Sequence, residues 1–161
     1  MIKISNVQQA DLPAVVAIER AGFSPAEAGS PAAFQDRLNK LPDTFLVAKA
    51  GDRVVGFIVG PAVSTRVIDD QMYETAPTNL PTGGYQLVLS LAVAPAYRGK
   101  GVGSQLLDAL ARVARASKRQ SVVLDSLAKN VPFYEHNGFH QAGVSPSSHA
   151  DETWLTMVKD L

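Results

Sequence analysis

Three alternating glycines between an apolar run and an amphipathic segment constrain this chain more than any other feature. Gly99, Gly101 and Gly103 lie in the sequence RGKGVGS, just after the nearly continuous apolar run 85–94. Such a run is typical of a central strand covered on both faces, and the leucines that follow the loop recur at helical spacing. A strand, a glycine turn and a helix N-terminus form an anion site, because first-turn N–H groups are unpaired and glycine lets a ligand approach the backbone. The sequence therefore predicts a phosphate-bearing ligand here.

Two common phosphate loops do not fit these glycines. A P-loop needs four residues between its first glycine and a Gly-Lys-Ser/Thr, which RGKGVGS does not provide. A Rossmann turn needs GxGxxG after the first strand of its domain, whereas this loop has GxGxG and follows a helical region and a hairpin. Asp125 imitates the ribose-binding acid of that turn, but the glycine spacing argues against a dinucleotide site. A glycine turn that merely joins a strand to a helix is the structural alternative.

The other segments predict an α+β (α/β) chain that forms a single domain over residues 1–161. Asp11 and Ser30 each precede a proline, as side-chain acceptors do at helix starts, and further helices follow the glycine loop and Asn130. The expected fold is a mixed central sheet of about six to seven strands flanked by about four helices. Strands are expected at 2–5, 44–50, 53–63, 85–94, 121–125 and 153–158. Residues 65–84 show no firm period and are either a functional lid or a mobile segment.

Composition excludes several kinds of site and partner. Fifteen Lys and Arg balance fifteen Asp and Glu, and zero net charge disfavours nucleic acid as a partner. Without cysteine, and with three scattered histidines, no metal site is expected. No apolar stretch approaches the ~20 residues of a membrane span, and the N-terminus turns polar too soon for a signal peptide, so we expect a cytoplasmic protein with no membrane partner. A charged fraction of 19% hints at a surface covered by a partner or a second copy, as in a homodimer.

Two motifs together resemble one family. Arg98, Gly101 and Gly103 form R-x-x-G-x-G, which resembles the acyl-CoA pyrophosphate loop of the GNAT superfamily of acetyl-CoA-dependent N-acetyltransferases. The stretch NVPFYEHNGF at 130–139 resembles the segment that closes the CoA site in this superfamily, and the element order is similar along essentially the whole chain. The sequences VPFYE, FIVG at 57–60 and SLAV at 90–93 look most like the serotonin (arylalkylamine) N-acetyltransferase branch.

The resemblance implies an acetyl-CoA site without a metal. The backbone of residues 91–93 would pair with the pantetheine arm and polarise the thioester carbonyl, since fixed N–H donors suit a developing oxyanion. The amides of residues 98–104 would hold the pyrophosphate. Ser104 and Asn130 have the alternative role of helix caps. The implied cofactor-binding residues are Leu91, Ala92, Val93, Arg98, Gly99, Lys100, Gly101, Val102, Gly103, Ser104, Asn130 and Phe133.

Tyr134 is the implied catalytic residue. A thiolate leaves when an amine attacks the thioester, and a phenol of pKa ~10 is a competent proton donor to that thiolate. The alternative for a tyrosine on a short amphipathic helix is ordinary packing with its hydroxyl bonded to backbone.

The sequence indicates the residues that would bind the acceptor amine less clearly. Glu19 and Glu27 border the first helix and the following loop, where this fold commonly builds the amine site, although solvated carboxylates are the default. Animal enzymes of the serotonin branch carry two histidines on the strand before the glycine loop; this chain has Leu87 and Leu89 at those positions, which implies an apolar floor and no imidazole relay. The amine's proton would leave through water held by backbone and a carboxylate such as Glu27, or the enzyme would capture free amine. Surface or structural roles are expected for all three histidines.

Two functions of different classes follow. The first is an enzyme that transfers acetyl from acetyl-CoA to a primary amine of a small molecule or peptide by direct attack in a ternary complex. The second is a non-catalytic acyl-CoA sensor or interaction module on the same fold. Tyr134 favours the first, and thiol release in the presence of an amine distinguishes them.

Overall fold

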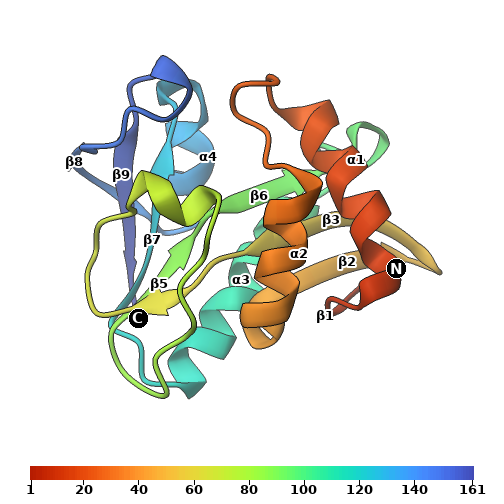
Figure 1. The fold of residues 1–161 in the computed structure, drawn as a ribbon, viewed down its shortest axis with the longest axis horizontal. Helices are drawn as coiled ribbons and strands as arrows, with labels where there is room; N and C mark the ends of the chain where they lie inside the picture. Colours follow the sequence, from red (N-terminus) through yellow and green to blue (C-terminus); the bar gives the residue numbers. More distant parts are fainter.

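The fold is built on two sheets that diverge from one interrupted strand (Figure 1). The computed structural model describes all 161 residues. The first sheet has the order β1-β2-β3-β6 and the second β4-β5-β7-β9-β8. The strands are β1 (Ile2–Asn6), β2 (Phe45–Ala50), β3 (Arg53–Val59), β4 (Ala62–Val63), β5 (Tyr85–Val88), β6 (Ser90–Val93), β7 (Ser121–Ser126), β8 (His140–Val144) and β9 (Leu155–Asp160). The helices are α1 (Leu12–Gly22), α2 (Pro31–Lys40), α3 (Val102–Ala116) and α4 (Val131–His136).

The apolar run that the sequence presents as one strand breaks at Leu89. Before this residue, β5 pairs in parallel with β7; after it, β6 pairs antiparallel with β3. The strand therefore changes neighbours, and β6 and β7 separate. The mixed α/β fold expected from the sequence is confirmed. The strands number nine rather than six to seven. The runs expected at 53–63 and 85–94 are each divided into two strands, and β8 is an additional short strand.

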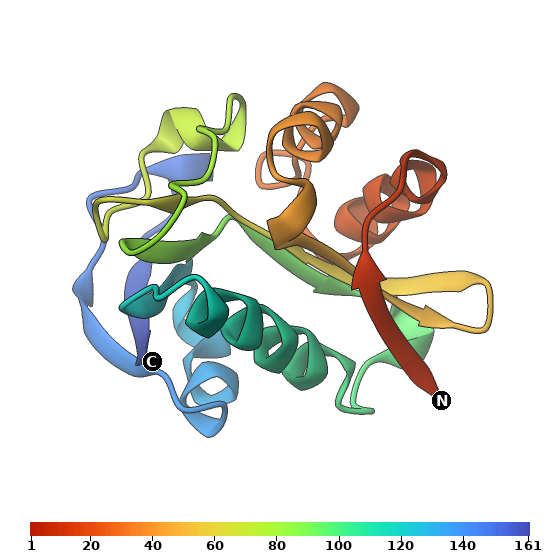
Figure 2. The same cartoon turned by 90° about the horizontal axis from the view of Figure 1, so that it is seen from below.

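Helices cover both faces of the sheets (Figure 2). On one side lie α1 and α2, above a core that contains the edge-to-face pair Phe34 and Phe57, whose ring centroids are 5.5 Å apart. On the other side lie α3 and α4, where the buried leucine face of α3 packs against β2, β3 and β7 in a second core. Each pair of helices thus covers one apolar face of the diverging sheets and buries one of the two cores.

The two predicted helix caps had different outcomes. Ser30 Oγ accepts a hydrogen bond from the Ala33 N–H at 3.1 Å, which confirms the cap of α2. Asp11 does not cap α1 with its side chain. Its carboxylate accepts a bond from the Gln8 N–H at 2.9 Å and pairs with Lys49 at 3.2 Å. The predicted helix start is confirmed, since Asp11 is the N-cap residue of α1 and a proline follows in the first turn. Only its role as side-chain acceptor for α1 is wrong, because the carboxylate binds Lys49 and the Gln8 N–H instead.

The long connection between β4 and β5 contains a short 3₁₀ helix, η3 (Asp70–Tyr73), that is tied to α2. Arg37 Nη2 donates to the Tyr73 carbonyl at 2.7 Å, and Lys40 Nζ donates to the Ala76 carbonyl at 2.9 Å. The Ala76 N–H in turn donates to Asp36 at 2.9 Å. These bonds place η3 beside the mouth of the site described below.

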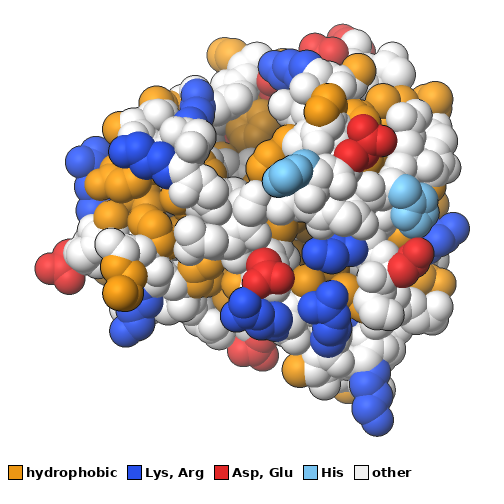
Figure 3. Space-filling view, turned by 180° about the vertical axis from the view of Figure 1, so that it is seen from behind, with side chains coloured by type: hydrophobic (Ala, Val, Ile, Leu, Met, Phe, Trp, Pro, Cys, Tyr) orange, Lys and Arg blue, Asp and Glu red, His pale blue; other side chains and the backbone are white.

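Charge is dispersed on the face shown in Figure 3, where Lys and Arg side chains alternate with Asp, Glu and apolar groups. No helix is long and apolar enough to cross a bilayer. No group of three or more His, Cys, Asp and Glu side chains is gathered as a metal site would require.

The junction between the sheets requires a residue without a side chain. A Cβ on Gly60 would lie 1.9 Å from the Leu87 carbonyl oxygen, which is backbone and cannot turn aside. We predict that Gly60→Ala lowers the free energy of unfolding by about 3 kcal/mol, the upper part of the range for overpacking. Gly22→Ala is the comparison, because its Cβ would meet nothing closer than 3.5 Å. Denaturant unfolding of both variants checks this; equal stability would show that the junction can relax.

Candidate active site

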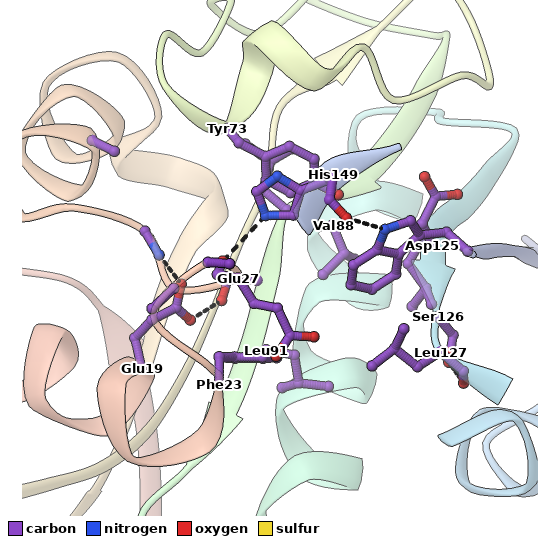
Figure 4. Close-up of a pocket in the computed structure, with 18 of the residues that line it drawn as sticks. Glu19, Phe23, Glu27, Tyr73, Val88, Leu91, Asp125, Ser126, Leu127 and His149 are labelled. Carbon is purple, nitrogen blue, oxygen red and sulfur yellow. Dashed lines mark hydrogen bonds between the residues drawn. The ribbon is translucent and has the colours of Figure 1, made fainter. Parts of the chain in front are cut away.

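Two cavities meet where β6 and β7 separate. The first, of about 280 Å³, lies between α1, α2, η3 and the β8–β9 loop (Figure 4). The second, of about 460 Å³, follows β6 to the glycine loop and α4. Six residues line both cavities and mark the point where they join: Phe23, Glu27, Leu91, Leu127, Asn130 and Tyr134. Two molecules bound one in each cavity would therefore meet at this junction.

The glycine loop has the backbone that an anion site needs. Gly99 and Gly101 have φ values of +73° and +81°, in the left-handed region that favours glycine. Gly101 is the N-cap residue just before α3, and no side chain caps the free N–H groups of the first turn. Gly103 lies so near Phe133 that a Cβ would come within 3.1 Å of the ring. An open, uncapped 15-residue helix beside a cavity fits a pyrophosphate.

Most of the implied cofactor-binding residues line this second cavity. They are Leu91, Ala92, Val93, Arg98, Gly99, Gly101, Gly103, Asn130 and Phe133. Three others do not: Lys100 lies over the Tyr97 ring, Val102 is buried in the core, and Ser104 lies inside α3. Ser104 lies inside α3 and does not cap it, so that alternative role is wrong. Asn130 is the N-cap residue of α4, as the alternative expected, but its side chain makes no capping hydrogen bond.

Only one edge of β6 is paired: its backbone bonds to β3 on one side and faces the space between β6 and β7 on the other. The Ala94 N–H donates to the Val55 carbonyl at 2.8 Å. Because the bonds of an antiparallel ladder alternate along a strand, Ala92 also faces β3, whereas the N–H groups of Leu91 and Val93 face the opposite edge. That edge has no neighbouring strand, since β7 has moved away. Two backbone donors therefore point into the space where the cavities join.

Tyr134 reaches this junction from α4. Its ring packs edge-to-face against Phe133 and Phe139, with centroids 5.1 and 5.7 Å away. Burial raises the pKa of Tyr134 to about 12. The phenol is thus protonated throughout the neutral range, which suits a proton donor.

A buried carboxylate forms the α1 side of the first cavity. Glu19 is only 3% exposed. Its Oε1 accepts a hydrogen bond from Ser90 Oγ at 2.5 Å and its Oε2 accepts one from the Gly29 N–H at 2.8 Å, both drawn in Figure 4. Burial raises the pKa of Glu19 by more than these bonds and the charge of Arg37, itself 2% exposed, lower it. Ser90 and Arg37 had no functional role in the sequence prediction.

Aromatic side chains from distant segments close the opposite wall. The His149 imidazole stacks on Tyr73 with centroids 4.3 Å apart, and its Nε2 lies 3.2 Å from the Glu27 carbonyl oxygen. Trp154 Nε1 donates to the His149 carbonyl at 2.9 Å. His149 thus joins η3, the α1–α2 loop and the β8–β9 loop (Figure 4). Of the two roles expected for His149, surface or structural, the structure supports the structural one, and the residue lies in the wall of the first cavity.

Of the other residues predicted to bind the acceptor, Glu27 and Leu89 line a cavity and Leu87 does not. Glu27 lines both cavities, and its Oε1 accepts a bond from the Ser24 N–H at 2.9 Å. Leu89 lines the first cavity as an apolar floor, whereas Leu87 is fully buried in the core and lines neither cavity. Asp125, also on the wall, accepts a bond from Ser145 Oγ at 2.8 Å, and burial raises the pKa of this carboxyl.

Comparisons with known proteins agree with this architecture. The family model of the acetyltransferase (GNAT) domain matches residues 42–141. A glucosamine 6-phosphate N-acetyltransferase of Trypanosoma brucei brucei is 43% identical over 49 residues, which cover 30% of this chain and only 33% of that relative. The crystal structure of Ard1 from Thermoplasma volcanium superposes with a TM-score of 0.78 at 25% identity over 99% of this chain and 97% of that one. The GphF GNAT-like decarboxylase in complex with isobutyryl-CoA, at 18% identity and a TM-score of 0.82 over 98% of both chains, shares the fold.

Removing the buried charge should change how stability depends on pH. The folded-state pKa of Glu19 is raised above its unfolded value, so the cost of burying its charge is absent at low pH and complete above the folded-state pKa. We predict that Glu19→Gln gains stability relative to the parent as pH rises from 4 to 8, by about 1.4 kcal/mol for every tenfold difference between the folded-state and unfolded-state acid dissociation constants. Denaturant midpoints across this range measure the gain. A stability difference that is constant with pH would contradict the burial effect.

Proposed function

Because the chain belongs to the acetyltransferase (GNAT) domain family, we propose that it transfers an acetyl group from acetyl-CoA to a primary amine by direct attack in a ternary complex. The observation that carries the proposal is the junction of the two cavities at Leu91 and Tyr134. A cosubstrate in the second cavity and an amine in the first would meet beside free backbone donors and a protonated phenol.

Each part of the second cavity has a role in this scheme. The α3 N-terminus and the glycine loop would hold the pyrophosphate, and the N–H groups of Leu91 and Val93 would pair with the pantetheine arm and the thioester oxygen. Arg98 donates to the carbonyls of Val93 (3.1 Å) and Ala21 (3.4 Å), which places its charge beside the loop. Asn130 and Phe133 would contact the arm from the opposite side.

The first cavity supports an amine acceptor that carries an apolar or aromatic group. Leu89 forms an apolar floor, and Tyr73, His149 and Trp154 supply aromatic surface around a carboxylate. We propose an acceptor that carries its amine on an apolar body. Leu89 is also a departure from the serotonin (arylalkylamine) branch, which has a histidine at this position, so the proposal does not extend to serotonin itself. The acetyl group itself would reach this cavity only at the junction.

Acetyl-CoA should stabilise the folded chain. A ligand at 100 times its Kd adds about 2.7 kcal/mol, which for a chain of this length raises Tm by roughly 5–10 °C. We predict that Gly101→Val abolishes the rise, because a β-branched residue is strained at φ +81° and would move the loop backbone away from the conformation that holds the pyrophosphate. Gly51→Val, strained in the same way at φ +61° in a remote hairpin turn, should keep it. No rise in the parent would refute the binding site.

Turnover should depend on the Tyr134 hydroxyl. The activity assay is thiol release from acetyl-CoA with a panel of arylalkylamines, polyamines, aminoglycosides and peptides. For the best amine, Tyr134→Phe should retain acetyl-CoA affinity and lose about 10²–10⁴-fold in turnover. The control is Tyr85→Phe, whose hydroxyl bonds to Gln120 away from both cavities. Unchanged turnover in Tyr134→Phe would exclude the acid role, and no thiol release with any amine would favour a non-catalytic sensor.

A further inference from the structure

We propose that Ser90 and Glu19 form a proton relay that takes the proton from the acceptor ammonium before it attacks the thioester. The inference rests on the proposed function, since an alkylamine of pKa ~10.4 is almost wholly protonated at neutral pH and has no lone pair to attack with. Ser90 would touch the amine, and Glu19 would act through Ser90.

The positions of the two side chains carry the relay. Ser90 precedes Leu91 in β6, so its hydroxyl lies one residue from a backbone donor at the junction. Ser90 and Glu19 both line the first cavity, where the acceptor amine would bind. Because Ser90 Oγ already donates to Glu19 Oε1 at 2.5 Å, its lone pairs remain available to accept a proton from the amine. The relay thus runs from the first cavity through the Ser90 hydroxyl to the Glu19 carboxylate, which is almost fully buried from solvent.

The surroundings of Glu19 suit a proton acceptor. Burial raises its pKa by more than the charges of Arg37 on α2 and His149 on the β8–β9 loop lower it. Tyr73 on η3 also faces it, and this phenol remains neutral because burial raises its pKa. The two hydrogen bonds from Ser90 and Gly29 are made to the carboxylate as acceptor. Glu19 is therefore a stronger base than an exposed glutamate.

Other bases near the cavity are engaged by different partners. Glu27 lies at the junction of the two cavities, but its Oε1 is bound by the Ser24 N–H. Asp125 Oδ2 is bound by Ser145, and its Oδ1 lies 3.5 Å from Thr156 Oγ1. His149 directs Nε2 at the Glu27 carbonyl. None of these bonds leads toward the thioester position at Leu91, whereas the Ser90 bond begins beside it.

The protons and electrons of the step balance as follows. The ammonium gives one proton to Ser90 Oγ as the Ser90 hydroxyl proton moves to Glu19 Oε1. The freed nitrogen lone pair forms a C–N bond to the thioester carbon, and the carbonyl electrons move onto oxygen. When the carbonyl re-forms, the C–S bond breaks, its electron pair stays on sulfur, and Tyr134 donates its proton there. The nitrogen's remaining excess proton returns to the Tyr134 phenolate, and Glu19 releases its proton to water.

The test compares kcat/KM in the parent, Glu19→Gln and Ser90→Ala across pH and across acceptors of different pKa. With an amine of pKa ~10 at pH 7, both variants should lose about 10²-fold. The loss should shrink toward parity as pH approaches the amine's pKa, and it should be small for an acceptor that is already unprotonated at pH 7. A free amine needs neither a base nor a counter-ion, so kcat and KM are also measured separately. Loss of the relay lowers kcat, whereas loss of a carboxylate that only binds the ammonium raises KM.

Control measurements keep the outcomes separate. Acetyl-CoA affinity and Tm of each variant confirm that it is folded, and Glu152→Gln, an exposed carboxylate on the same loop as His149, should match the parent. A defect of equal size for every amine and pH would assign Glu19 and Ser90 a structural role and overturn the relay. Parent-like rates in both variants would do the same. A parent inactive with every amine would instead overturn the proposed function.

Discussion

The change of strand neighbours at Leu89 is the constraint on which the rest of the structure depends. The Leu89 N–H bonds to the Val59 carbonyl at 2.8 Å, so the chain is transferred to β3 at this residue and leaves β7 behind. Unpaired backbone groups away from water are costly, so the free edge of β6 must face solvent or a ligand. The two cavities follow from this edge: one extends along it toward the glycine loop, and the other opens above the residues at the break.

The glycine loop and Tyr134 could be predicted because their signals are local. Three glycines within five residues, set between a strand and a helix, limit the backbone to few conformations, and VPFYE places an aromatic pair on one turn of helix. The strand break has no such signal. Residues 85–94 are mostly apolar and include no proline, glycine or charged residue. Their hydrophobic pattern and composition therefore predict one continuous strand. The position of the break depends on tertiary pairing, because residues before Leu89 bind β7 and residues after it bind β3.

Sequence patterns indicate Glu19, Glu27 and Leu89 for the first cavity, the proposed acceptor cavity, but not its remaining walls, because these come from segments far apart in sequence. Arg37, Tyr73 and His149 each lie in a stretch whose own pattern carries no motif, and their contacts span 36 residues or more. The bond from Arg37 to Tyr73 fixes η3, and the stack on Tyr73 fixes the β8–β9 loop. Exchanging side chains in these loops would reshape the acceptor cavity while β6 and the glycine loop stayed in place, so acceptor specificity and cosubstrate binding are separable on this fold.

The same gap also separates the two proton-transfer groups. Glu19 approaches from α1 and Tyr134 from α4, on opposite sides of the β6 edge, and burial raises the pKa of both. The effect differs in kind: it makes the carboxylate a better proton acceptor, and it keeps the phenol protonated. A carboxyl group and a phenol differ widely in their ordinary pKa values, which suits them to the separate roles of base and acid. The divergence of two strands therefore positions the backbone donors, and it would also set the direction of proton transfer in the proposed mechanism.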